Sequence, residues 1–318
     1  MSQSKVRIFR ALFTGVVLIL LVVFFTKNHE SLRSLQYLKT PDLLIAVALV
    51  LMGLVFSAEQ VRRCFVRGPS LEIGPWRWFQ YYVCGRLANN ILSALGTLYR
   101  AAQLRLVHSI SISDYFAATS LSSYISLSLM LIASFVVAVL VMEWQVLYSL
   151  VVGIFGTTFL ILSLIAIPIV VGRAFPNTTY SHLVIQKSIS FASAVHRSFI
   201  EAGRAKGTLL VVFIYAAAGL AANVGLFYIV GIALFPNFSL VEAIFFALIS
   251  KLSTLVSFTP GNIGIREAAF EAFARLGEAG ALTGSGAVFS LTLRALGLLV
   301  VIPLGSIFLI REGTEKAD

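Results

Sequence analysis

Long apolar runs separated by short charged segments dominate the chain. The runs cover residues 11–26, 43–58, 115–142, 144–172, 207–241 and 285–310. A membrane-spanning helix needs about 20 apolar residues, so the last four runs are long enough and the first two are marginal. We therefore predict an all-α integral membrane protein with about six transmembrane helices.

Two further segments, residues 79–106 and 243–276, are apolar but interrupted by polar residues. These are Arg86, Asn89, Asn90, Gly96, Arg100 and Arg105 in the first segment, and Lys251, Pro260, Gly261, Asn262, Gly264, Arg266, Glu267 and Arg275 in the second. Each segment has a glycine or Pro-Gly break near its middle. Irregular backbone survives at membrane depth only where protein or a cavity surrounds it. We predict that each segment is a re-entrant helical hairpin.

The composition agrees with a membrane location. Of the 318 residues, 58% are hydrophobic and 12% are charged. A soluble domain carries about twice that share of charge, and a disordered chain has far fewer apolar residues. The net charge of +10 is explained by the enrichment of Lys and Arg on the cytoplasmic side of membrane proteins, so we expect no nucleic-acid partner. The two cysteines, Cys64 and Cys84, are expected to be free thiols.

The distribution of basic residues predicts the topology. Lys5, Arg7 and Arg10 precede the first run, no cleavage site of small residues follows it, and we interpret it as an uncleaved span. If both interrupted segments re-enter, most Lys and Arg residues lie inside, and only Lys27, Arg33 and Lys39 lie outside. If residues 79–98 crossed fully, the basic stretch 187–206 would lie outside. The positive-inside rule favours the first topology, with both termini cytoplasmic in the plasma (inner) membrane.

A single membrane domain is expected, with two halves, residues 1–172 and 207–318. The connector, residues 173–206, contains an amphipathic stretch that we interpret as a surface helix, a lipid-sensing role being the alternative. Residues 93–102 and 257–268 resemble each other weakly: each has a break of small residues followed by an Arg. Because the two hairpins would enter from opposite sides, they predict an inverted repeat, an architecture that places transporter sites near the midplane.

The segment from Thr259 to Ala269 carries the strongest chemical signal. Pro260 and Gly261 are expected to stop one helix, Gly264 to permit a tight turn, and a new helix to start near Ile265. The free amides of its first turn, beside Arg266 and Asn262, would form an anion site suited to a lipid phosphate.

Buried charge is also expected in the last span and in the first hairpin. Arg294 must have a partner, either Glu267 or Glu271, and the pair could be structural or could contact substrate. Arg100 is the counterpart of Arg266, with snorkelling to the surface as the alternative. The remaining polar residues of these helices are more typical of interhelical hydrogen bonds than of ligands; they are Arg86, Asn89, Asn90 and Lys251.

Enzyme signatures are absent from the sequence. It has no P-loop, no His-Glu-x-x-His and no Cys-x-x-Cys, and its four histidines are scattered. We therefore expect no catalytic residues, no metal and no cofactor, and transport that uses no ATP.

The stretch from Thr259 to Ala269, followed by a Gly-rich loop and Arg294, resembles the transmembrane region of lysylphosphatidylglycerol synthases, which also occurs alone in flippase-like proteins. Pro260, Gly261, Gly264, Arg266 and Glu267 match the family's second motif, and Asn262 replaces a glycine. The family's first motif has two asparagines, a Pro-rich Gly-Glu segment and an arginine. This sequence keeps Asn89, Asn90, Gly96 and Arg100 but lacks the proline and the glutamate.

The resemblance implies lipid translocation between leaflets. Under this hypothesis, the lipid phosphate binds Arg266, Arg100, Asn262, Gly261 and Gly264, while Glu267, Arg294, Pro260, Asn89 and Asn90 gate or brace. The sequence ends at Asp318, so we expect no aminoacyltransferase domain and no lysyl transfer. The substrate would be an anionic phospholipid or a polyprenyl-phosphate-linked sugar. Two alternatives remain: a membrane component of glycolipid or envelope-lipid synthesis, working with biosynthetic enzymes, and a scaffold that anchors a soluble partner.

Overall fold

The computed structural model describes residues 35, 38–65, 73–91, 95–141, 193, 206–235, 237–253, 264–276 and 286–314. This part of the chain is helical and contains no strand, as predicted. Its helices are α3 (Thr40–Cys64), α4 (Pro75–Ile91), α5 (Leu95–His108), α6 (Ile112–Val141), α9 (Lys206–Leu234), α10 (Leu240–Ser253), α11 (Ile265–Leu276) and α12 (Gly286–Thr314).

Four of these helices, α3, α6, α9 and α12, are long and apolar enough to cross a membrane. They coincide with four of the six apolar runs. The other two runs, residues 11–26 and 144–172, and nearly all of the connector 173–206 lie outside the described residues. Each interrupted segment is a pair of short helices, α4 with α5 and α10 with α11. The predicted breaks are therefore confirmed.

The helices form two units with the same order of long, short, short and long elements. The first unit is α3 to α6 and the second is α9 to α12. The main packing pairs are preserved when the units are exchanged: α4 packs on α12 as α10 packs on α6, and α5 packs on α6 as α11 packs on α12. This exchange identifies an internal repeat at the level of packing, although the two sequences are barely similar.

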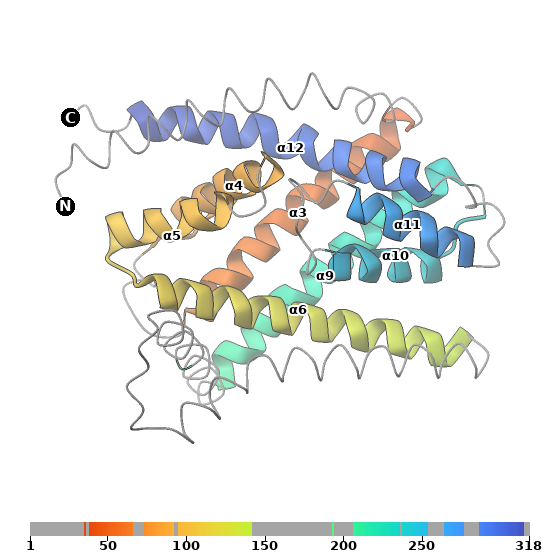
Figure 1. The fold of residues 1–318 in the computed structure, drawn as a ribbon, viewed down its shortest axis with the longest axis horizontal. Helices are drawn as coiled ribbons and strands as arrows, with labels where there is room; N and C mark the ends of the chain where they lie inside the picture. Colours follow the sequence, from red (N-terminus) through yellow and green to blue (C-terminus); the bar gives the residue numbers. More distant parts are fainter. Residues whose placement is uncertain are drawn as a thin grey trace, which may run out of the picture.

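The two units are joined along α3 and α9, which are counterparts of each other. Gly219 of α9 lies against Phe56 of α3, and Gly225 lies against Leu49, so the numbering falls along one helix as it rises along the other. The two helices are therefore antiparallel. Antiparallel packing of counterparts is the relation expected of an inverted repeat. Figure 1 shows α3 and α9 running diagonally between α6 and α12, with α4 and α5 towards one end and α10 and α11 towards the other.

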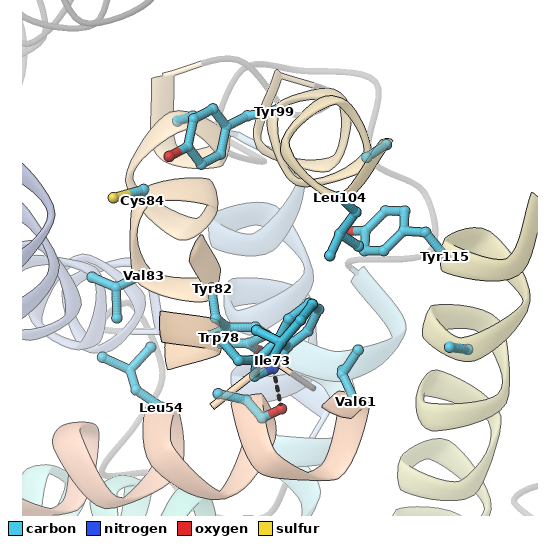
Figure 2. Close-up of a cluster of buried hydrophobic side chains, with 14 of the residues drawn as sticks. Leu54, Val61, Ile73, Trp78, Tyr82, Val83, Cys84, Tyr99, Leu104 and Tyr115 are labelled. Atoms are coloured by element: carbon cyan, nitrogen blue, oxygen red, sulfur yellow. Dashed lines mark hydrogen bonds between the residues drawn. The ribbon is translucent and has the colours of Figure 1, made fainter. Parts of the chain in front are cut away.

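One core cluster joins the first short pair to the long helices. Trp78 of α4 is buried and its Nε1 donates a hydrogen bond to the carbonyl oxygen of Ala58 in α3, at 2.6 Å (Figure 2). Its ring also meets Phe65 edge to face, with centroids 5.6 Å apart. Because the indole N–H is satisfied by α3, the ring can be buried without an unpaired donor.

The second core cluster surrounds α10 and α11 and is rich in phenylalanine. The Phe246 ring lies 5.0 Å from that of Phe270 and 5.1 Å from that of Phe289, and all three side chains are fully buried. These rings come from α10, α11 and α12. They fix α11 against the last long helix, which sets the position of the charged residues at its start.

Apolar side chains face outward from the long helices. Leu44 of α3, Leu140 of α6, Leu210 of α9 and Ile307 of α12 are all more than half exposed. Soluble proteins rarely expose contiguous apolar surface on this scale, whereas lipid chains cover it at no cost. These outward-facing side chains and the four long apolar helices indicate a multi-pass membrane protein.

Candidate functional site

The second half begins its short helix α11 at a sharp turn. Gly264 adopts a φ of +87°, which L side chains rarely tolerate, and α11 starts at the next residue, Ile265, as predicted. The preceding helix α10 is described as far as Ser253. That Pro260 and Gly261 stop a helix stays a prediction. Pro260, Gly261 and Asn262 lie outside the described residues.

Glu267 holds the start of α11 and joins it to α12. One of its oxygens accepts a hydrogen bond from the backbone N–H of Gly264 at 2.8 Å, the geometry of a capping box. The other oxygen lies 3.1 Å from Nη2 of Arg294 and accepts a bond from the Ser290 hydroxyl at 3.3 Å. The partnership of Arg294 with Glu267, one of the two predicted from the sequence, is therefore confirmed. Ser290 was not foreseen.

Arg266 precedes Glu267 in the sequence but takes no part in the ion pair between Glu267 and Arg294. Its side chain is half-buried, and its guanidinium carbon lies 5.2 Å from the ring centre of Phe270. Its Nε is buried without a hydrogen-bond acceptor, and no ion pair connects Arg266 to a carboxylate among the described residues. The amides of the first turn of α11 lie beside it and have no acceptor within the helix. This end of α11 combines a cation with backbone donors, which is the chemistry of an anion site.

Arg100 occupies the corresponding hairpin of the first half. It is buried, and its Nε donates a hydrogen bond to the carbonyl oxygen of Gly96 at 3.2 Å. Its guanidinium carbon lies 5.2 Å from the ring centre of Tyr82 and 5.9 Å from that of Tyr115. A buried guanidinium does not snorkel, so that alternative is wrong. The two tyrosines come from α4 and α6, and nothing in the local sequence of α5 indicates them.

Close backbone contact explains how Arg100 fits between the helices. A Cβ on Gly85 would lie 2.8 Å from the Nε of Arg100, and a Cβ on Gly96 would lie 1.7 Å from the carbonyl oxygen of Gly85. Only glycine at both positions lets α4 and α5 cross this closely. Oδ1 of Asn89 accepts a hydrogen bond from the N–H of Gly96 at 2.8 Å and so caps the start of α5. Asn89 therefore braces the hairpin; no hydrogen bond of Asn90 is described.

Arg100 and Arg266 lie in separate clusters, each with its own aromatic neighbours. Tyr82 and Tyr115 belong to the core cluster of the first short pair, and Phe270 belongs to the Phe-rich cluster of the second. Neither Cys64 nor Cys84 forms a disulfide, as predicted, and the structure buries both side chains. Within the described ranges, no group of His, Cys, Asp or Glu side chains is arranged to hold a metal ion.

Comparison with known proteins bears on nearly the whole chain. Residues 12–305 match the family model described as the lysylphosphatidylglycerol synthase TM region. Neither the curated proteins nor the solved structures include a match. Both charged hairpins fall inside the matched range, which covers far more than half of the chain. The chain belongs to the lysylphosphatidylglycerol synthase transmembrane-region family.

Proposed function

We propose that the protein translocates an anionic, phosphate-bearing lipid between the leaflets of the membrane and is not an enzyme. The observation that carries this proposal is the presence of arginines without an ion pair among the described residues, Arg266 and Arg100, at the broken helices of two inverted halves. A phosphate group is the ligand that a guanidinium and free helix amides recognise together. Membership of a lipid-related membrane family agrees with it.

In this proposal the second half binds the phosphate and the first half adds positive charge. Arg266 and the first turn of α11 bind the phosphate directly, together with Gly264 and the neighbouring residues Gly261 and Asn262. Arg100 adds positive charge from within the first hairpin. Glu267 and Arg294 brace α11 on α12, and Asn89 braces the first hairpin. Transport follows a lipid or ion gradient because the sequence has no nucleotide-binding motif.

The topology proposed for this function has six spans and two re-entrant hairpins in the plasma (inner) membrane. Both termini lie in the cytoplasm, so the short helix pairs approach the midplane from opposite sides. Reporter fusions at the two termini and single cysteines placed in the loops would test it. Labelling of both termini from outside the cell would contradict it.

Reconstitution tests the function. The purified protein in vesicles of phosphatidylcholine with fluorescent phosphatidylglycerol should remove the inner-leaflet protection of the probe against dithionite. The same measurement is made with fluorescent phosphatidylcholine and with a polyprenyl phosphate, so that the rates for the three lipid classes can be compared. Arg266→Gln should lower the rate by about tenfold or more, because a charge-assisted hydrogen bond contributes about 1.5–3 kcal/mol.

Arg105→Gln is the matched control because Arg105 is an exposed arginine of α5 with no ion pair among the described residues. It removes the same charge and should leave the rate unchanged. If folded wild-type protein moves no lipid, translocation is wrong. The alternative role in envelope-lipid or glycolipid synthesis would then be tested by co-purification with a biosynthetic enzyme.

A further inference from the structure

Two arginines of the first hairpin lie against a single tyrosine ring. The guanidinium carbon of Arg86, in α4, is 5.6 Å from the ring centre of Tyr82, and that of Arg100, in α5, is 5.2 Å from the same centre. The ring itself is buried. Tyr82 and Arg86 are four residues apart in α4, so they share one face of that helix. The hairpin therefore gathers two positive charges around one buried side chain.

Gly85 brings the two guanidinium groups to the same side of α4. A Cβ at this position would lie 2.8 Å from the Nε of Arg100 and 2.9 Å from its Cγ and Cδ. The side chain of Arg100 therefore crosses α4 directly over Gly85. Since Arg86 is the next residue along α4, both arginines reach Tyr82 from adjacent positions.

No acidic side chain among the described residues forms an ion pair with Arg86 or Arg100. The face of an aromatic ring attracts a cation but leaves its charge in place. Two like charges repel each other, and the repulsion is stronger in a medium of low dielectric constant than in water. Arg100 is buried, whereas the side chain of Arg86 is exposed. An anion can therefore reach the pair by way of Arg86.

Tyr115 provides a second, independent observation at the same place. Its ring centre lies 5.9 Å from the guanidinium carbon of Arg100, and the side chain extends from α6 towards α5 (Figure 2). The side chain is fully buried, and its hydroxyl oxygen has no hydrogen-bond partner. A buried hydroxyl without a partner is costly, and its presence calls for an explanation such as a ligand. An acceptor bound beside Arg100 would receive the hydrogen bond of this hydroxyl.

We propose that Arg86, Arg100 and Tyr115 bind the phosphate of a phosphomonoester. Such a group carries a charge of about −1.5 to −2 at pH 7 and three acceptor oxygens, which match two guanidinium groups and one hydroxyl. A phosphodiester carries a single negative charge and fewer free oxygens, so it compensates only one of the two arginines. The proposal rests on the proposed function for the ligand's being a lipid, such as phosphatidic acid or a polyprenyl phosphate. Free phosphate is the other source of the same chemistry.

Binding in detergent tests the site apart from transport. The purified protein is titrated with phosphatidic acid, with phosphatidylglycerol and with diacylglycerol, and thermal stabilisation is followed. The wild type should bind phosphatidic acid about tenfold more tightly than phosphatidylglycerol. Arg86→Gln should lower the affinity for phosphatidic acid by about tenfold and remove most of this preference, because a charge-assisted hydrogen bond is lost. Arg105→Gln, which removes an exposed arginine of α5, should change neither affinity, and diacylglycerol should stabilise all variants equally.

Tyr115→Phe separates a ligand contact from a structural role. It removes only the unpaired hydroxyl, so the free protein should be at least as stable as the wild type, while the affinity for phosphatidic acid falls by about threefold to tenfold. Tyr228→Phe, in the second core cluster, is the matched control and should leave the affinity unchanged. Both test variants should fold, because Arg86 is exposed and phenylalanine suits a buried position.

The proposal is overturned if phosphatidic acid does not bind, if it binds no more tightly than phosphatidylglycerol, or if Arg86→Gln and Tyr115→Phe both keep the wild-type affinity. Inorganic phosphate that displaces phosphatidic acid at equal concentration would identify free phosphate as the ligand and refute the lipid assignment.

Transport in vesicles then distinguishes this proposal from the proposed function. If the wild type binds phosphatidic acid through Arg86 but moves neither fluorescent phosphatidic acid nor phosphatidylglycerol, the site is established and translocation is refuted. If the wild type moves phosphatidylglycerol but shows no preference for phosphatidic acid in binding, translocation is established and the phosphomonoester site is refuted.

Discussion

Removing the carboxylate of Glu267 should be among the most destabilising changes in the chain. Glu267 accepts a hydrogen bond from Gly264, accepts one from Ser290 and pairs with Arg294 at 3.1 Å. The side chains of Arg294 and Glu267 are only 8% and 15% exposed. Breaking a buried pair by deleting one partner costs about 3–5 kcal/mol, because the remaining charge loses its compensation. We expect a loss in this range for Glu267→Ala.

A second capping glutamate in the same protein provides the control. Glu242 accepts hydrogen bonds from the backbone N–H and the hydroxyl of Ser239 at the start of α10, but it takes part in no ion pair among the described residues. Glu242→Ala should therefore cost only the capping contribution, about 1 kcal/mol. The difference between the two alanine variants measures what the contacts of Glu267 with Arg294 and Ser290 contribute beyond the cap.

The assay is reversible unfolding in mixed detergent and dodecyl sulfate micelles, followed by circular dichroism. Arg294→Met should destabilise less than Glu267→Ala, because Glu267 then keeps its bonds to Gly264 and Ser290. The double variant should recover part of the loss, giving a coupling energy of about 1–3 kcal/mol for residues in contact. If Glu267→Ala costs no more than Glu242→Ala, or if the coupling is zero, the ion pair does not brace α11 on α12.

Three further predictions concern the first hairpin and the thiols. Gly96→Ala should destabilise the protein by about 1–3 kcal/mol or more, because its Cβ would meet the backbone of α4 at 1.7 Å. A Cβ on Gly297 in α12 would meet nothing within 4 Å, so Gly297→Ala should be neutral or stabilising. The unfolding midpoints of the two variants would show this order, and equal midpoints would contradict it. Asn89→Ala should lower the free energy of unfolding by about 1 kcal/mol, because α5 loses its cap. An unchanged midpoint in the same unfolding assay would show that this cap does not stabilise the protein. Cys64 and Cys84 are buried thiols outside any disulfide, so maleimide should label them only as the protein unfolds, and rapid labelling of the folded protein would refute their burial.

The sequence predicted those features that depend on local chemistry. Gly264 followed by a polar first turn is enough to start a helix at Ile265, and a charged Arg294 within an apolar run must find a carboxylate nearby. The inverted repeat also followed from the position of the breaks and the basic residues. Each of these inferences uses neighbours in sequence or the energy of charge in a membrane.

Features that depend on contacts between distant elements were missed. The packing of Phe246 in α10 against Phe270 in α11 and Phe289 in α12 brings three separate helices together, and no local pattern indicates it. The burial of Arg100 between Tyr82 and Tyr115 requires three helices to converge.

The arginines at the short helices and in α12 have two kinds of neighbour, and in the proposed function this difference distinguishes a bracing residue from a binding one. Arg294 is paired with the carboxylate of Glu267, which compensates its charge. Arg100 and Arg266 lie against the rings of Tyr82 and Phe270 instead. A cation on an aromatic face gains about 0.5–2 kcal/mol, less than the cost of at least ~2.5 kcal/mol for an arginine at the bilayer centre. The rings therefore hold each guanidinium in place without neutralising it, and in the proposed function a lipid phosphate supplies the missing negative charge.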